Sequence, residues 1–190
     1  MSDLDIVSVD SEKLELMHFT DPRMTIKPPA FNFEQDKDKA ELLAEILKKA
    51  MKRFGAVGIS ANQLGMPFRV FTIGNEEKQI TMFNPQIVGV SKEQIAMEEG
   101  CISFPGFFLT LRRPQEIVVA YQDEKGEYVS AQYTGVAARI ILHEYDHMEG
   151  INFTFHSSNF KLKYTLERFK KRQRKLQQKL LQRAQHVKRK

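Results

Sequence analysis

The segment His143-Glu144-Tyr145-Asp146-His147 has the residue types and spacing of a metal-binding site, in the pattern H-E-x-x-H. In a helix, residues four positions apart lie on the same face about one turn apart, so both imidazoles can reach one metal ion. Glu144 lies one position round the helix, where it can move protons on a metal-bound water without being a ligand. The alternative interpretation is two partly exposed histidines paired by chance.

A metal site of this kind needs a third protein ligand. One enzyme class supplies a histidine six residues after the second one, but Phe153 stands there in this sequence. Glu167 is the downstream acid in range, and it lies among lysines and arginines that favour a solvated helix charge. We therefore expect Cys101, the single cysteine, to be the third ligand, although a lone cysteine is usually a small buried hydrophobe. The segment Phe104-Pro105-Gly106 is predicted to turn the chain away after it.

A Cys-His-His set leaves a fourth position open for water, which is the arrangement of a catalytic rather than a structural site. A thiolate with two imidazoles suits Zn²⁺ or Fe²⁺ far better than Mg²⁺ or Ca²⁺. A third element, from Gly55 to Gly65, has small residues that permit close backbone approach and one long amide, Gln63. A phosphate-binding loop is the competing interpretation of this segment, but no Gly-Lys-Ser/Thr sequence follows it and no strand precedes it.

Helices and short strands must hold these residues in place. Apolar residues at helical spacing predict helices over residues 33–54, over 136–148, and from about 160 to the C-terminus. Short apolar runs bounded by turn residues predict strands over 68–73, 80–83, 87–90, 117–121 and 128–133. The pattern predicts an α+β fold of small antiparallel or mixed sheets packed around a central H-E-x-x-H helix, with a long C-terminal helix in addition.

The charge of the 190-residue chain is divided unevenly. Residues 161–190 hold 13 of the 29 Lys and Arg residues and one acid, Glu167, so this tail carries +12 and residues 1–160 carry −7. A uniformly basic nucleic-acid-binding domain is therefore excluded. The acidic start of the chain argues against a secretory signal, and no run of about 18 apolar residues predicts a membrane span. We expect a cytoplasmic protein without membrane contact.

Together, the three elements resemble those of the peptide deformylases, whose segments are G-x-G-φ-A-A-x-Q, E-G-C-φ-S and H-E-x-D-H. Here they read Ala56-Val57-Gly58-Ile59-Ser60-Ala61-Asn62-Gln63, Glu99-Gly100-Cys101-Ile102-Ser103 and His143-Glu144-Tyr145-Asp146-His147. The resemblance covers roughly residues 20–156. The sequence departs from the family pattern at Ala56, at Ser60 in place of alanine, and at Leu142. Phe108 stands roughly where some relatives carry a substrate-facing arginine.

The resemblance implies removal of the N-formyl group from N-formylmethionyl peptides, with release of formate. It implies Cys101, His143 and His147 as metal ligands, Glu144 as the base, and the Gln63 amide and Ile102 backbone N–H as oxyanion donors. It implies one divalent metal ion, Fe²⁺ before Zn²⁺, Ni²⁺ or Co²⁺. The substrate backbone is expected at Val57, Gly58 and Gly100, and its methionine side chain beside Ile102, Ile140 and the stem of Arg139. Asp146, paired with Arg113, is expected to orient a ligand histidine.

The predicted domain organisation is a catalytic domain over residues 1–158 and a basic C-terminal helix over 159–190 as its tail. The substrate is a nascent chain, and the basic tail over 161–190 is expected to dock on the ribosome through rRNA, as some family members use this helix. A solvated helix is the alternative for the tail. A zinc endopeptidase with Glu167 as third ligand, and a ribosome- or RNA-binding module with a degenerate catalytic body, are the alternative functions.

Overall fold

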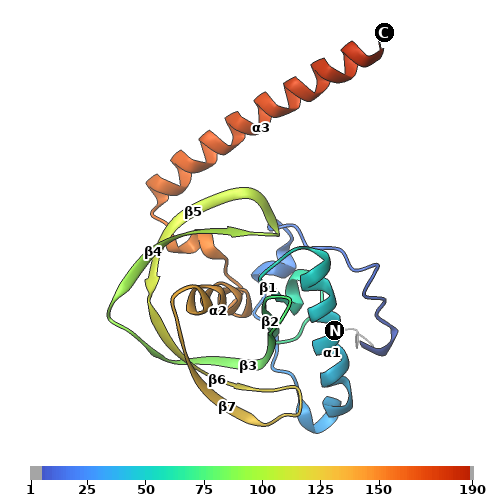
Figure 1. Cartoon of the computed structure of the whole chain (residues 1–190), viewed down its shortest axis with the longest axis vertical. Coiled ribbons are helices and arrows are strands. Elements are labelled where there is room, and N and C mark those ends of the chain that lie inside the picture. The colour runs from blue at the N-terminus through green and yellow to red at the C-terminus, as the bar shows by residue number, and fades with distance from the viewer. Residues whose placement is uncertain (1–5, 189–190) are drawn as a thin grey trace.

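The computed structural model describes residues 6–188, with side chains described as far as residue 184. Residues 1–5 of the predicted catalytic domain and 189–190 of the predicted tail lie outside the described residues. The chain forms three α-helices and seven strands within that range (Figure 1). The helices are α1 (Phe33–Arg53), α2 (Gly135–Met148) and α3 (Asn159–Lys188); the strands are β1 (Gly58–Ser60), β2 (Val70–Gly74), β3 (Gln79–Val90), β4 (Gln94–Cys101), β5 (Phe104–Pro114), β6 (Glu116–Gln122) and β7 (Tyr128–Thr134).

Two antiparallel sheets surround α2, the helix that carries the H-E-x-x-H segment. The larger sheet has the strand order β1-β2-β3-β6-β7, and the smaller one is the pair β4-β5. In Figure 1, α2 lies between the β4-β5 pair and the larger sheet, and it contacts strands of both. The predicted α+β fold of small sheets around this helix, with a long C-terminal helix, is confirmed.

The first helix, α1, covers one end of the larger sheet and forms much of the core. Its start is fixed by Asn32, whose side chain accepts hydrogen bonds from the backbone N–H groups of Glu34 and Gln35. Its buried stripe includes Leu43 and Leu47, which are fully buried against β1 and β2. The predicted boundaries, 33–54, therefore agree with the structure.

Helix α2 is held by apolar packing on one side and by a glycine stop at its end. Ala138, Ile141 and Leu142 pack into the core of the larger sheet. Gly150, just past the helix, has φ +69°, and a Cβ there would lie 2.7 Å from the carbonyl oxygen of Thr25. Only glycine fits that position, so the helix ends where the sequence predicted.

The strands differ from the prediction in three places. The predicted segments 80–83 and 87–90 form one strand, β3, with register shifts between Phe83 and Gln86 and between Ile87 and Gly89. The sequence also did not predict the short strand β1 or the hairpin formed by β4 and β5. Inward positions of this hairpin carry the charged residues Glu99 and Arg113, which break the apolar alternation that marks a strand.

The expected turn at Phe104-Pro105-Gly106 is wrong. The chain turns at Ile102-Ser103, and residues 104–106 begin β5. The register shifts between the Gly100–Phe108 pair and the Cys101–Phe104 pair, so the irregular start of β5 accommodates Pro105 and Gly106 (φ +75°). The turn places Cys101 at the end of β4, next to α2.

The C-terminal helix α3 packs on the body with its first turns only. Leu162, Leu166 and Phe169 lie against a cluster that contains Phe104 and Phe107 of β5. Beyond these turns the helix projects away from the body (Figure 1), and Leu176, Leu180 and Leu181 are exposed. Among the described residues, no helix combines the length and the apolar character that crossing a membrane requires.

Candidate active site

The thiol and the two imidazoles expected to bind a metal converge in the structure. The donor atoms of Cys101, His143 and His147 lie within 4.8 Å of one another. The Cys101 Sγ and His147 Nε2 are 3.5 Å apart, and the two imidazole rings are nearly perpendicular. Three soft or borderline donors aimed at one point fit a divalent transition metal ion. Among the described residues, no other cluster of three or more His, Cys, Asp or Glu side chains lies close enough together to hold a metal ion.

A carboxylate that sequence reasoning missed stands behind one of the imidazoles. Glu99 is buried, and its Oε2 lies 3.3 Å from Nδ1 of His143, leaving Nε2 free for a metal. Burial works to raise the pKa of Glu99, but hydrogen bonds from His143, Arg113 and Arg139 outweigh burial and lower it to about 2. Glu99 precedes Gly100-Cys101, so the available signal in the sequence was an acid two residues before a predicted ligand.

The electrostatic field at the two imidazoles differs. Burial works to lower the pKa of His143, but the hydrogen bonds with Cys101 and Glu99 outweigh burial and raise it to about 10. Burial, together with the charge of His143 and Arg113, lowers the pKa of His147 well below its ordinary value. Cys101 and Glu99 therefore favour positive charge at His143, whereas burial and the neighbouring cations oppose it at His147.

Two buried arginines tie Glu99 to the rest of the fold. Arg113 donates from Nε and Nη2 to the Glu99 carboxylate at 2.8 Å each, and its Nη1 lies 2.8 Å from Oδ2 of Asp146. Arg139 donates from Nη1 to Oε1 of Glu99 at 2.7 Å. Asp146 also faces Nε2 of His156 at 3.0 Å. Asp146 thus pairs with Arg113, and the carboxylate that touches a ligand histidine is Glu99.

Glu144 lies beside the donors and is buried on the floor of a groove. Its Oε2 accepts a hydrogen bond from the Ser60 hydroxyl at 2.5 Å. Burial raises the pKa of Glu144, while His143 and the Ser60 hydroxyl act in the opposite direction. Gly58 leaves room for the other oxygen, because a Cβ at this position would lie 2.6 Å from Oε1. A buried carboxylate of this kind is poised to take up a proton.

The Gln63 amide is fixed next to the Cys101 thiol. Its Nε2 donates to the Ser103 hydroxyl at 3.1 Å and lies 3.4 Å from Sγ of Cys101. Its Oε1 accepts the backbone N–H of Ser60 at 3.0 Å, and its backbone carbonyl accepts the N–H of Met17 at 2.7 Å. The amide nitrogen is therefore held next to the donor cluster, in contact with Cys101 and Ser103.

A groove of about 710 Å³ opens onto these groups. The predicted substrate-binding residues Val57, Gly58, Gly100, Ile102 and Ile140 all line it, and so do Gln63, Cys101, His143 and Glu144. Its outer wall is mostly apolar and includes Leu16, Phe54, Met97, Phe108 and Val136. The Phe108 ring lies over Gly100, where a Cβ would be 2.4 Å from the ring. An apolar groove with polar groups at its floor is the usual form of a small-ligand site.

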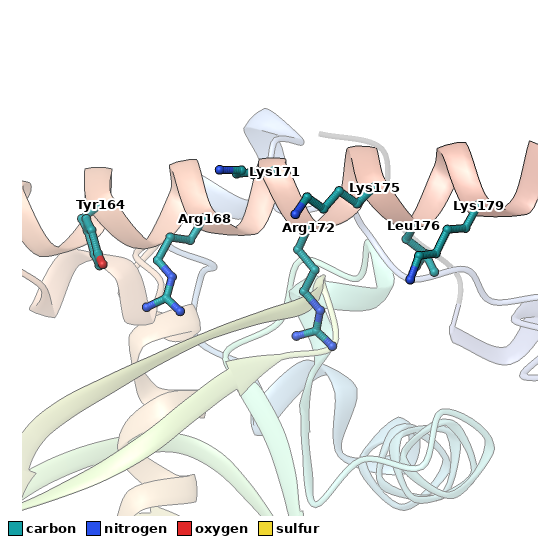
Figure 2. A pocket seen from close by; sticks show the side chains of 7 residues that line it. All are labelled: Tyr164, Arg168, Lys171, Arg172, Lys175, Leu176 and Lys179. Atoms are coloured by element: carbon teal, nitrogen blue, oxygen red, sulfur yellow. The ribbon is translucent and has the colours of Figure 1, made fainter.

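The alternative third ligand, Glu167, lies on α3, exposed, with Oε1 3.4 Å from Nζ of Lys170. It therefore takes no part in the donor cluster. A separate hollow of about 750 Å³ runs along α3 and is lined by Tyr164, Arg168, Lys171, Arg172, Lys175, Leu176 and Lys179. Figure 2 shows these side chains, all from one helix and dominated by cations. It is a basic surface rather than a catalytic pocket.

The Cys101 thiol and the two imidazoles of the H-E-x-x-H helix define a candidate hydrolytic metal centre, which opens to a groove at Cys101 and His143. The family model "Polypeptide deformylase" matches residues 14–163. The chain therefore belongs to the polypeptide deformylase family, a family of metal-dependent hydrolases, and the predicted family is confirmed.

Individual relatives agree with this assignment. The chain is 41% identical over 105 residues to a peptide deformylase of Treponema pallidum, a match that covers 55% of this chain and spans 65% of the length of that relative. It is 34% identical to one from Christiangramia forsetii, covering 78% of this chain and 83% of the relative.

Among solved structures, the plant peptide deformylase PDF1B has a TM-score of 0.77 at 27% identity, covering 88% of this chain and 92% of that one. A peptide deformylase from Synechococcus elongatus in complex with actinonin has a TM-score of 0.76 at 25% identity, covering 82% and 85%.

Proposed function

We propose that this protein is a peptide deformylase, which hydrolyses the N-formyl group of N-formylmethionyl peptides and releases formate. Two observations carry the proposal: the donor atoms of Cys101, His143 and His147 converge, and Cys101, His143, Glu144 and Gln63 line one groove. Each group has a place in amide hydrolysis: three ligands, a base and a donor to the oxyanion. The family to which the chain belongs supports the same reaction.

The proposed metal is one divalent cation held by Cys101, His143 and His147, with Fe²⁺ as the physiological ion and Zn²⁺, Ni²⁺ or Co²⁺ as substitutes. When bound, such a cation makes a water acidic and polarises the formyl oxygen. The donor set supports a transition metal over Mg²⁺ or Ca²⁺, and its thiolate makes a ferrous enzyme sensitive to oxidation. Glu99 supports the site by holding the Nδ1 side of His143.

Glu144 is the proposed general base. It takes the proton of the attacking water and later gives it to the leaving amine, so the same carboxylate serves both halves of the reaction. Its raised pKa favours proton uptake. The Gln63 amide N–H and the backbone N–H of Ile102 donate to the oxyanion that develops from the formyl oxygen, where loss of one donor typically costs about 10²–10³ in kcat.

Two unpaired strand edges support backbone recognition of the peptide. In the described sheets, β1 pairs with β2 alone and β4 pairs with β5 alone. Val57 and Gly58 at the start of β1, and Gly100 in β4, both line the groove. An extended peptide can therefore add to these edges through its main chain, while its methionine side chain lies beside Ile140. Recognition through the backbone suits an enzyme that must accept many sequences.

The test is formate release under anaerobic conditions, with the protein loaded separately with Fe²⁺, Ni²⁺, Co²⁺ and Zn²⁺. The substrates are a formyl-Met tripeptide and the same tripeptide without the formyl group, with peptide-bond cleavage followed in parallel. Formate release from the first substrate, with no cleavage of either peptide chain, supports the proposal. Cleavage of internal peptide bonds in both substrates would instead identify an endopeptidase.

We also propose that the basic tail, residues 161–190, docks on the ribosome in the cytoplasm, where formylated nascent chains emerge. The tail holds 13 Lys and Arg residues, and α3 projects beyond its packed first turns. Truncation after Gln173 keeps Leu162, Leu166 and Phe169 on the body, so the fold is expected to survive. This truncation removes seven of the 13 cations, so docking predicts salt-sensitive co-sedimentation with ribosomes that is strongly weakened on truncation, while turnover of a free peptide is retained. Unchanged co-sedimentation would assign the tail to a solvated helix.

A further inference from the structure

We propose that Ser60 is a positioning residue for the reaction, which holds Glu144 through its hydroxyl and Gln63 through its backbone N–H. The inference rests on the proposed function. It concerns a position where the deformylase pattern has alanine, so the hydroxyl is a feature of this chain rather than of the pattern.

The geometry joins three buried groups. Ser60 is the last residue of β1 and is fully buried. Its Oγ donates to Oε2 of Glu144 at 2.5 Å, and its N–H donates to Oε1 of Gln63 at 3.0 Å. Within the described part of the chain, the Ser60 hydroxyl is the hydrogen-bond partner found for the Glu144 carboxylate. Ser60 therefore holds both the proposed base, Glu144, and the proposed oxyanion donor, Gln63, in position.

The hydroxyl fixes a torsion that is otherwise loose. The terminal torsion of a glutamate side chain has a broad, roughly two-fold profile, so packing alone holds the carboxylate plane weakly. With Oε2 held by Ser60, Oε1 stays beside Gly58, where the absence of a side chain leaves it room. Both Gly58 and Glu144 line the groove, so this end of the side chain lies beside the space that substrate and water would occupy. A base held this way starts closer to the geometry of proton transfer.

The two bonds from Ser60 can be separated experimentally. Ser60→Ala removes the hydroxyl and leaves the backbone N–H, so Gln63 keeps its partner. Because alanine occupies this position in the family pattern, the substitution is expected to fold. Ser60→Cys keeps a side chain of similar size with a weak donor, and it carries the test if the alanine variant does not fold. Thr72→Val is the matched control, since it removes a buried hydroxyl from β2, the strand next to β1. The Thr72 hydroxyl lies 2.9 Å from that of Thr81 and away from the proposed base.

The experiment measures kcat, KM, metal per chain and thermal unfolding for the wild type and the three variants, all loaded with the same metal. A hydrogen bond to a charged carboxylate contributes more than one between neutral groups. Part of that contribution is expected to appear in kcat, which should fall about 5- to 30-fold in Ser60→Ala and Ser60→Cys. KM should stay within about twofold and metal content should match the wild type, while Thr72→Val keeps the wild-type kcat. This split between kcat and KM is what a purely structural role would not produce.

If the wild type releases formate, two results would overturn the inference about Ser60 while the proposed function stands. One is a kcat in Ser60→Ala and Ser60→Cys equal to that of the wild type. The other is a loss of activity that follows loss of metal or of folded protein. If the wild type itself releases no formate from formyl-Met peptides under any metal, the proposed function is overturned and the inference falls with it.

Discussion

Removing the Glu99 carboxylate is expected to destabilise the protein strongly. Glu99 is 5% exposed and accepts hydrogen bonds from Arg113, Arg139 and His143, so Glu99→Ala leaves two buried guanidinium groups short of an anion. Breaking a buried ion pair by removing one partner costs about 3–5 kcal/mol. The pKa of Glu99, lowered to about 2 from an ordinary value of 4.5, agrees in direction, since the same contacts stabilise the charged carboxylate in the folded protein.

Thermal unfolding followed by circular dichroism measures this effect. For a domain of this size, each kcal/mol shifts Tm by about 2–4 °C, so Glu99→Ala should lower Tm by about 6–20 °C at pH 7. Glu98→Ala, an exposed position on the same strand, is the matched control and should lie within about 0.5 kcal/mol of the wild type.

The same assay has a pH arm. Since the folded-state pKa of Glu99 is depressed, its contribution is fully present above pH 4.5 and is lost as the pH falls from 4.5 toward 2. Wild type and Glu99→Ala should therefore converge in acid. If the free energy of unfolding of Glu99→Ala at pH 7 lies within about 1 kcal/mol of that of Glu98→Ala, the reasoning is refuted.

The other predictions concern the groove and the metal ligands. Gly58→Ala places a Cβ 2.6 Å from Oε1 of Glu144 and 2.9 Å from Cγ2 of Ile140, so kcat should fall at least about tenfold. Gly89→Ala, whose Cβ would meet Val118 at 3.4 Å, is its control, and equal kcat values for the two variants would contradict the prediction. Cys101→Ser should lower the metal retained per chain after dialysis, measured by plasma emission spectroscopy; unchanged metal content removes Cys101 from the ligand set. Chelation of the bound metal should lower Tm of the wild type, and a Tm insensitive to chelator argues against a site coupled to folding.

Much of the site could be predicted because its chemistry is local in sequence. The histidines, four positions apart, and the flanking Glu144 belong to one helix, and the periodic apolar residues of that helix show where it lies. The convergence of Cys101 depends on tertiary structure, yet the third ligand could be sought by elimination among a few candidates. The alternative acid, Glu167, belongs to a helix that carries a run of cations, and in the structure it is exposed and pairs with Lys170.

The remainder depends on contacts between distant segments. Strands β4 and β5 have inward charges at Glu99 and Arg113, which are satisfied by each other and by Arg139 across the fold, and no local pattern shows that compensation. For the same reason Asp146 was expected at a ligand histidine, whereas the structure places Glu99 there. The role of Ser60 depends on a hydrogen bond across 84 residues of sequence, which only the folded chain shows.

The central claim is tested most directly by counting formate released per chain by wild type and Glu144→Ala at equal metal content. The account predicts multiple turnovers of a formyl-Met peptide by the wild type. It predicts essentially none by Glu144→Ala, with metal still near one ion per chain, because the base is lost while Cys101, His143 and His147 remain. Formate release by Glu144→Ala at a rate close to that of the wild type would contradict the account.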